Sequence, residues 1–318
     1  RWRSALNPGP AARLDSDRQL TMQLSERMTD HVVLIDGGLS TALEEQGHDL
    51  NDPRWTARLL SEDPEALRVA HESFVAVGAE VVTSASYQTV DPDELRAGGA
   101  AARAATAGTA LVAASVGPYG ALLHDGSEYR GRYGLSIEEL VAFHAPRLAT
   151  LIDAAPDAIA VETIPDIDEA RALAIALADV GDELPDTWVA FSAGANPTIG
   201  RAGVATAAGD DLGDAAAVFA DLDRVVAIGV NCTAPSHVAP TLERIAERTD
   251  RPLVAYPNGG GRWDPATGCW DHAGERITAD MVASWLASGV RLLGGCCGFG
   301  PDALADLADL AGVQRRTR

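Results

Sequence analysis

The sequence predicts one α/β domain folded as a (β/α)8 barrel, the TIM-barrel class. Three observations support this prediction. Short apolar runs alternate with longer segments of helical periodicity along most of the chain. A helix between successive strands implies right-handed crossovers and therefore a parallel sheet. Eight such units within about 280 residues match the size of a closed barrel.

The predicted strands are short apolar runs, each followed by a helical segment. The strands are expected at residues 31–35, 80–84, 110–116, 158–161, 187–191, 225–230, 252–256 and 290–293, and the helices at 39–46, 64–77, 93–106, 136–153, 167–180, 214–222, 235–248, 278–288 and 301–311. An open doubly wound sheet is the alternative, but it would more often carry a G-x-G-x-x-G motif after its first strand. The first strand here ends in Asp36-Gly37-Gly38 instead.

Residues 1–30 lack periodicity, and we expect them to be an N-terminal tail or an extension ahead of the natural start. The barrel domain is expected over residues 31–318. The first 30 residues contain no apolar core followed by a small-residue cleavage site, so no secretory signal is predicted. Only four cysteines occur in 318 residues, which is typical of a protein in the reducing cytoplasm.

The charge balance limits the possible partners. The chain has 25 basic and 46 acidic residues, a net charge of −21 at pH 7, which argues against binding nucleic acid. No apolar run reaches the ~18–20 residues that a membrane span needs. We therefore expect small-molecule substrates, with neither nucleic acid nor membrane as a partner, and a monomer or small homo-oligomer.

Polar residues collect just beyond the predicted strand ends. In a barrel these positions share one mouth, where such enzymes have their active sites. The residues at these positions are Asp36, Tyr87, Tyr119, Glu162, Ser192, Asn231, Cys232, Asn258, Cys296 and Cys297.

Three of the four cysteines belong to this set. Cys232 follows the sixth strand, and Cys296 and Cys297 follow the eighth within Gly294-Gly-Cys-Cys-Gly298, whose glycines allow a turn that aims both sulfurs at one point. Three thiolates suit Zn²⁺ and leave one tetrahedral position open, as in catalytic zinc sites. Inert core cysteines or a vicinal disulfide are the alternatives. Cys269 has no obvious partner and is expected to be a bystander, with a role as fourth ligand as the alternative.

A zinc ion with three thiolate ligands carries net charge −1, so it is a weak Lewis acid that is poor at activating water. Such a metal is suited to binding a thiol substrate as its thiolate, which is nucleophilic at neutral pH. The pattern therefore predicts alkyl transfer to a thiol.

The motifs resemble the homocysteine S-methyltransferase family over residues 32–310. The stretches that carry the resemblance are Asp36-Gly-Gly-Leu-Ser-Thr41, Leu50-Asn-Asp-Pro-Arg-Trp55, Thr83-Ser-Ala-Ser-Tyr-Gln88, Ser115-Val-Gly-Pro-Tyr-Gly120, Glu162-Thr-Ile-Pro165, Gly229-Val-Asn-Cys-Thr233, Tyr256-Pro-Asn258 and Gly294-Gly-Cys-Cys-Gly298. Residues 193–213 have no clear counterpart in the family pattern.

The resemblance implies a zinc-dependent barrel enzyme that methylates homocysteine to methionine. It implies that Cys232, Cys296 and Cys297 bind the zinc and that the homocysteine sulfur takes the open position. Asp36 and Glu162 would hold the α-amino group of homocysteine; pairing with arginine or helix capping is the alternative for both carboxylates. The remaining residues expected to bind substrate are Gly37 and Gly38, which would let the backbone approach it, and Tyr87, Tyr119, Asn231 and Asn258.

The expected methyl donor is a sulfonium, a cation that carboxylates and aromatic faces attract. Tyr129 and Tyr133 are candidates for donor binding, with simple packing as the alternative. The insertion at residues 125–131 resembles that of members using S-methylmethionine, with S-adenosylmethionine as a poorer donor. Two alternative functions remain: the same chemistry on another thiol or a selenol, and a non-catalytic barrel that senses zinc or thiols.

Overall fold

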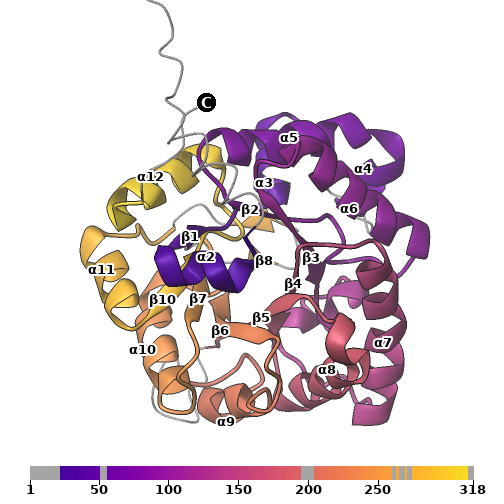
Figure 1. Cartoon of the computed structure of the whole chain (residues 1–318), viewed down its shortest axis with the longest axis vertical. Helices are drawn as coiled ribbons and strands as arrows, with labels where there is room; N and C mark the ends of the chain where they lie inside the picture. The colour runs from indigo at the N-terminus through magenta and orange to yellow at the C-terminus, as the bar shows by residue number, and fades with distance from the viewer. Residues whose placement is uncertain are drawn as a thin grey trace, which may run out of the picture.

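Eight parallel strands form one sheet in the order β1-β10-β7-β6-β5-β4-β3-β2. A parallel bridge between Ile35 and Val81 joins the two ends of this sheet. The computed structural model describes residues 22–50, 56–194, 204–259, 263–264, 269–270 and 274–313. Figure 1 shows the helices arranged in a ring around the strands. The predicted (β/α)8 barrel is confirmed.

All eight predicted strands are present. They are β1 (Val33–Leu34), β2 (Val81–Thr83), β3 (Leu111–Val116), β4 (Ala158–Ile164), β5 (Asp186–Ser192), β6 (Val225–Asn231), β7 (Leu253–Tyr256) and β10 (Val290–Leu293). Strand β4 extends to Ile164, beyond its predicted end, because its register shifts after Val161 and pairing with β5 resumes at Ile164. A small antiparallel pair, β8 (Trp263–Asp264) and β9 (Cys269–Trp270), was not predicted.

The predicted helices are present in the predicted order, and a further helix at residues 57–62 was not predicted. They are α3 (Leu39–Glu45), α4 (Ala57–Glu62), α5 (Pro64–Ala76), α6 (Pro92–Thr106), α7 (Ile137–Asp153), α8 (Ile167–Val180), α9 (Leu212–Ala217), α10 (Pro235–Ala246), α11 (Ala279–Ala287) and α12 (Pro301–Ala311), with short 3-10 turns η1 (Tyr119–Leu123), η2 (Ser127–Tyr129) and η3 (Gly181–Glu183). Helix α5 begins as predicted, with the Asp63 carboxylate accepting from the backbone of Ala66 and proline in the first turn. Within the described segments, no helix is long and apolar enough to cross a bilayer.

Residues 24–30 correct the prediction of a tail, because they form helix α2 (Leu24–Asp30). Leu24 and Met28 are buried in the cluster that fills the barrel interior. The backbone and hydroxyl of Ser25 donate to the Asp186 carboxylate at the start of β5, at 2.8 and 2.6 Å. Helix α2 therefore covers the amino-terminal end of the barrel, and Figure 1 shows it across the barrel centre. A seven-residue helix held by contacts distant in sequence gives little periodic signal.

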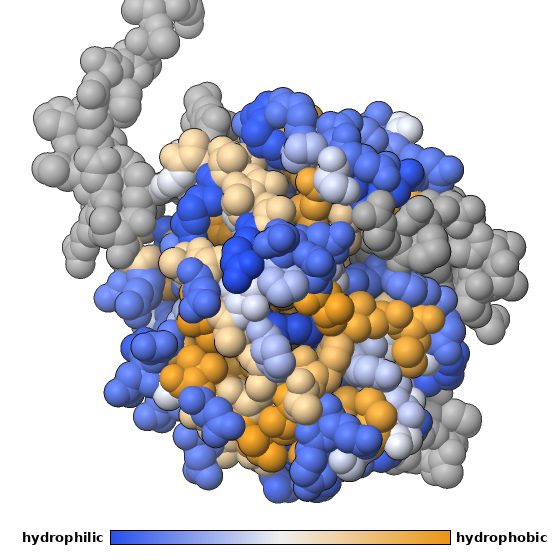
Figure 2. Space-filling model, turned by 90° about the vertical axis from the view of Figure 1, so that its right-hand side faces the viewer, coloured by the Kyte–Doolittle hydropathy of each residue, from blue (hydrophilic) through white to orange (hydrophobic). Residues whose placement is uncertain are grey.

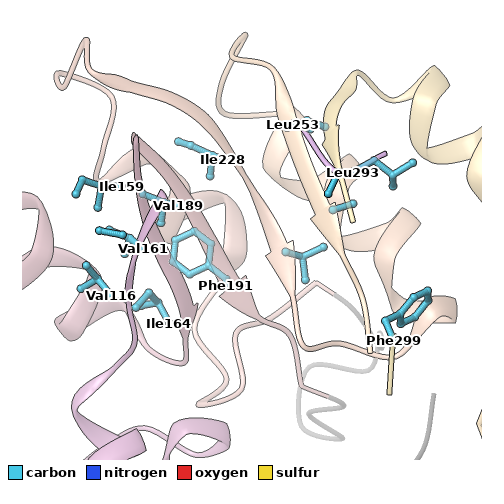
Figure 3. Packing of buried hydrophobic residues seen from close by; sticks show 14 of the residues in the cluster. Val116, Ile159, Val161, Ile164, Val189, Phe191, Ile228, Leu253, Leu293 and Phe299 are labelled. Carbon is cyan, nitrogen blue, oxygen red and sulfur yellow. The ribbon is translucent and has the colours of Figure 1, made fainter. Parts of the chain in front are cut away.

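The core has two layers, one on each side of the strands. Val189 and Phe191 of β5 face the surrounding helices, whereas Trp188 and Ala190 face the barrel interior. This alternation follows the two-residue period of a strand. Figure 3 shows part of the outer layer, where Phe191 lies next to Ile164 of the neighbouring strand. Because side chains fill the barrel interior, we expect a functional site at the carboxyl ends of the strands. The face in Figure 2 has polar residues mostly around its margin and apolar residues gathered across its middle.

His71 on α5 makes stability sensitive to acid. Its side chain is buried, and neither ring nitrogen has a hydrogen-bond partner among the described residues. Burial lowers the pKa of His71 from 6.5 to about 4. The unfolded chain therefore binds a proton that the folded chain does not, so stability falls as pH drops from 6.5 towards 4.

We predict that His71→Leu flattens the dependence of the melting temperature on pH between pH 7 and 5. At pH 5 the substitution should remove an acid-induced loss of about 2 kcal/mol from the free energy of unfolding. Thermal denaturation of both proteins across this range measures it. Parallel curves for the two proteins would contradict the assignment.

Candidate functional site

Three cysteines meet at the carboxyl end of the barrel. Cys232 follows β6, and Cys296 and Cys297 follow β10. The Cys232 Sγ lies 3.1 Å from that of Cys296 and 3.7 Å from that of Cys297, and all three sulfurs lie within 4.8 Å of one another. All three thiols are free, so the vicinal disulfide considered as an alternative is not formed.

The spacing of these sulfurs fits a metal ion. Thiolates placed tetrahedrally at about 2.3 Å from zinc stand about 3.8 Å apart. The separation between Cys232 and Cys297 agrees with this value, and that between Cys232 and Cys296 is somewhat shorter. Cys232 is buried, and the other two are half-buried. The donor set suits a soft metal ion.

The pKa shifts of the three cysteine thiols indicate how many of them ionise without a bound cation. The thiols of Cys296 and Cys297, together with the Tyr129 hydroxyl, donate hydrogen bonds to the Cys232 sulfur and hold the pKa of Cys232 well below its usual value. The same contacts with Cys232, together with burial, raise the pKa of Cys296 and Cys297 well above theirs. The protein alone therefore favours one thiolate, and three thiolates need a cation to balance them.

The backbone at Cys232 adopts a strained conformation. Its φ is 47°, in the left-handed region, and Thr163 on β4 has a φ of 62°. Such a conformation costs about 1–2 kcal/mol for a residue with a side chain. Asn231 ties the two together: its Oδ1 accepts from the Thr163 backbone at 2.7 Å, and its Nδ2 donates to the Thr163 hydroxyl at 2.8 Å. Asn231, expected to bind substrate, thus has its amide bonded to the protein.

The cysteine loop after β10 is bonded on both sides. The Cys296 N–H donates to the Pro257 carbonyl at 2.8 Å, and the Cys297 carbonyl accepts from Gly259 at 2.7 Å. On the other side, the Gly298 N–H donates to the Thr41 hydroxyl at 2.9 Å. Asn258 lies buried in the adjoining loop, its backbone bonded to Thr233.

The glycines act differently from the prediction. Of Gly294, Gly295 and Gly298, only Gly298 has a positive φ, of 79°. A Cβ at Gly294 would lie 2.7 Å from the Asp36 carbonyl oxygen, and one at Gly295 would clash with the Phe299 ring. The first two glycines therefore allow close packing rather than a turn.

Gly37 and Gly38 likewise make room for the protein itself. A Cβ at Gly38 would lie 2.7 Å from the Cys296 carbonyl oxygen, and one at Gly37 would meet Phe74 and Phe299. The structure shows close approach of the segment that carries Cys296 and Phe299, whereas the expected approach to substrate stays a prediction.

Two buried carboxylates lie at the mouth. Asp36 accepts from the Thr83 backbone at 2.8 Å and from its hydroxyl at 3.1 Å. Glu162 accepts from the hydroxyls of Ser115 and Tyr256. Within the described part of the chain neither forms an ion pair or caps a helix, contrary to the alternative considered above. Burial raises the pKa of Asp36 well above its usual value and that of Glu162 to about 7.

The four tyrosines divide into two pairs. The Tyr129 hydroxyl lies 3.2 Å from the Cys232 sulfur, and the Tyr87 hydroxyl is bonded to Thr163. Tyr119 and Tyr133 pack against each other instead, with ring centroids 5.3 Å apart. The structure thus brings Tyr87 and Tyr129 to the site and places the other pair at the base of the insertion.

A buried arginine holds the loop that carries Tyr87. The Arg147 guanidinium donates to the carbonyls of Tyr87, Thr89 and Gly117, at 3.2, 3.2 and 3.0 Å. Burial lowers the pKa of Arg147 to about 10, and these three acceptors compensate for its loss of solvation. Arg147 therefore fixes the two loops beyond β2 and β3.

Sequence reasoning missed several residues of this site. Thr83, Ser115 and Tyr256 bond the two carboxylates, and their positions at strand ends were the available signal. Glu128 lies in the insertion at residues 125–131, where only Tyr129 was predicted to have a role. Its Oε2 is buried without a hydrogen-bond partner among the described residues, and burial raises its pKa to about 7. Cys269 lies in β9, and its side chain is outside the part that the structure describes.

Comparison with known proteins decides the family. The family model for homocysteine S-methyltransferase matches residues 33–311. The chain belongs to the homocysteine S-methyltransferase family. Its relatives include homocysteine S-methyltransferase YbgG of Bacillus subtilis, 34% identical over 90% of this chain and 96% of that protein. The selenocysteine Se-methyltransferase of Brassica oleracea var. italica is also 34% identical, over 87% of this chain and 88% of that protein.

A solved structure from this family has the same fold. The metallated form of the homocysteine methyltransferase MmuM from Escherichia coli matches with a TM-score of 0.75 and 36% identity. The match covers 88% of this chain and 96% of that one. A metal therefore occurs in a family member, in agreement with the cysteine cluster found here.

We predict that Cys232→Ala and Cys297→Ala each abolish stoichiometric metal binding, because removal of one of three sulfur ligands leaves an incomplete site. Elemental analysis of the purified proteins measures it. Cys269→Ala is the matched control and should retain the metal. Full metal content in Cys232→Ala would contradict the site, and loss in Cys269→Ala would identify a fourth ligand.

Proposed function

We propose that this protein is a zinc-dependent methyltransferase that forms methionine from homocysteine. The donor would be a methyl sulfonium, with S-methylmethionine preferred to S-adenosylmethionine. One observation carries the proposal: the three-cysteine cluster lies beside two buried carboxylates that have no cationic partner among the described residues. Membership of the homocysteine S-methyltransferase family supports the choice of acceptor.

Cys232, Cys296 and Cys297 would hold the zinc ion. A zinc ion bound by these sulfurs would lower the pKa of an incoming thiol and so make it nucleophilic at neutral pH. The Tyr129 hydroxyl, 3.2 Å from the Cys232 sulfur, would stabilise negative charge on that ligand. Because three adjacent thiols must stay reduced for this role, we propose that the enzyme works in the cytoplasm.

Asp36 and Glu162 would orient the acceptor through its α-ammonium group. Both carboxylates are held in place by hydrogen bonds from the protein, Asp36 by Thr83 and Glu162 by Ser115. An ammonium group would provide the positive charge that these buried groups lack, which favours their ionised forms. The acceptor would then be fixed at two points, its sulfur and its amine.

The transfer itself needs alignment more than acid–base catalysis. The acceptor thiol gives its proton to solvent, its sulfur attacks the methyl carbon in line, and the electron pair of the breaking C–S bond returns to the donor sulfur. The donor leaves as a neutral thioether, so no leaving group needs protonation. Tyr87 and Tyr129 would form an aromatic wall that attracts the sulfonium and excludes water.

Turnover with different donors tests the proposal. Purified zinc-loaded protein should form methionine from homocysteine with S-methylmethionine, more slowly with S-adenosylmethionine and not with betaine. Chromatographic detection of methionine measures each reaction. Absence of product with both sulfonium donors would refute the proposed reaction.

We predict that Glu162→Gln raises the KM for homocysteine by about tenfold or more, because it removes a charged partner of the ammonium group. The KM for the sulfonium donor should change less than about twofold. Initial rates with each substrate varied in turn measure both constants. An unchanged homocysteine KM would show that Glu162 does not hold the amine.

A selenol acceptor is a second candidate, because one relative is named a selenocysteine Se-methyltransferase. The same cysteine cluster would serve it, since a selenol ionises more easily than a thiol. Comparison of kcat/KM for selenocysteine and homocysteine decides which is the better substrate. A higher value for homocysteine would keep the first assignment.

A further inference from the structure

Glu128 is a half-buried residue, and the roles proposed above leave its carboxylate without a function. It lies in η2 within the insertion, and its Oε2 is buried with no hydrogen-bond partner among the described residues. The nearest arginine in sequence, Arg130, donates to Asp125 and Ser127 instead. A buried, unsatisfied carboxylate oxygen is costly, so a ligand that supplies its partner is the natural explanation.

The surroundings of Glu128 belong to the site. Burial is the main cause of its raised pKa, and the negative charge of Cys232 adds to it. After burial, the Glu128 carboxylate is the next cause that raises the pKa of Tyr87, and it adds to the larger effects of burial and of the two cysteines on the pKa of Tyr129. Glu128 therefore shares its environment with the two tyrosines that lie beside the cysteine cluster.

The insertion that carries Glu128 is fastened at both ends. The Tyr119 N–H and the Tyr133 hydroxyl both donate to the buried Glu169 carboxylate of α8, at 2.6 and 3.1 Å. The Ser192 hydroxyl at the end of β5 donates to the Glu128 carbonyl at 3.4 Å. Because its backbone is held, the Glu128 side chain keeps its place near the cysteines.

The charges of the substrates match the carboxylates of the site. Homocysteine brings one ammonium group, whereas S-methylmethionine brings an ammonium and a sulfonium. Asp36 and Glu162 are assigned to the acceptor, and each already accepts two or more hydrogen bonds from the protein. Glu128 remains for the donor, and one of its oxygens is free to accept.

We propose that Glu128 binds a positively charged group of the methyl donor, either its α-ammonium or its sulfonium, and so selects cationic donors. This proposal rests on the proposed function. Glu128 acts by direct contact with the donor, whereas Glu169 and Ser192 position it.

Glu128→Gln tests the proposal, since it removes the charge and keeps the shape. It should raise the KM for S-methylmethionine by about tenfold or more and leave that for homocysteine within about twofold. Calorimetric binding of S-methylmethionine should weaken to the same extent. The melting temperature of the free protein should stay equal or rise, because an uncompensated buried charge is removed.

Three further measurements complete the test. Glu128→Asp, which keeps the charge, should give a KM between those of wild type and Glu128→Gln. Glu138→Gln removes the same charge at an exposed position of α7 and should match wild type. Dimethylsulfoniopropionate is a sulfonium without an ammonium group, so it shows which group Glu128 contacts. If Glu128→Gln binds both this compound and S-methylmethionine more weakly, the contact is to the sulfonium. If it binds only S-methylmethionine more weakly, the contact is to the ammonium.

An unchanged KM and binding constant for S-methylmethionine in Glu128→Gln would overturn the inference. Equal increases for both substrates together with a lower melting temperature would also overturn it, because they indicate a structural role. Wild-type protein without turnover on any sulfonium would instead refute the proposed function. Calorimetry would then still decide the inference, which requires that wild type bind S-methylmethionine more tightly than Glu128→Gln.

Discussion

Uncompensated negative charge at the barrel mouth is the constraint on which the rest of the site depends. Three thiols and the carboxylates of Asp36, Glu162 and Glu128 are gathered there, and no described residue forms an ion pair with any of these carboxylates. Burial makes each charge more difficult to maintain, so the folded protein alone keeps several of them protonated. A metal ion and the positively charged groups of the proposed substrates would resolve this imbalance.

The protein holds this arrangement by hydrogen bonds and close packing. Asn231 joins two strand ends whose residues Thr163 and Cys232 adopt left-handed conformations, and it is 68 residues from Thr163 in sequence. Gly38 admits the cysteine loop to within contact of the first strand end. These contacts hold backbone residues of the site in strained conformations. The packing of the surrounding barrel compensates for the energetic cost of this strain. Residues of the candidate site are positioned here by neighbours on other strands and loops.

The fold and the cysteine cluster were predictable for a common reason. Short apolar runs alternating with helices predict a parallel barrel, and a parallel barrel brings every strand end to one mouth. Cys232 and Cys296 could therefore be placed together although they are 64 residues apart. The pairing of individual polar groups was not predictable in this way. That Asn231 bonds Thr163, or that the Glu128 Oε2 has no partner, depends on side-chain directions that no periodicity encodes. Gly37 was predicted to let the backbone approach substrate, and the structure shows it in close contact with Phe74 and Phe299, which the sequence does not reveal.

Helix α2 has a consequence for how the folding unit is defined. The segment that matches the family begins at residue 33, yet Leu24 and Met28 fill the amino-terminal end of the barrel interior. A chain trimmed to the family boundary would expose that interior and lose the bonds between Ser25 and Asp186. The structured domain thus extends beyond the segment that the family model matches. A fusion, tag or circular permutation of this protein should keep Leu24–Asp30, because this helix closes the amino-terminal end of the barrel.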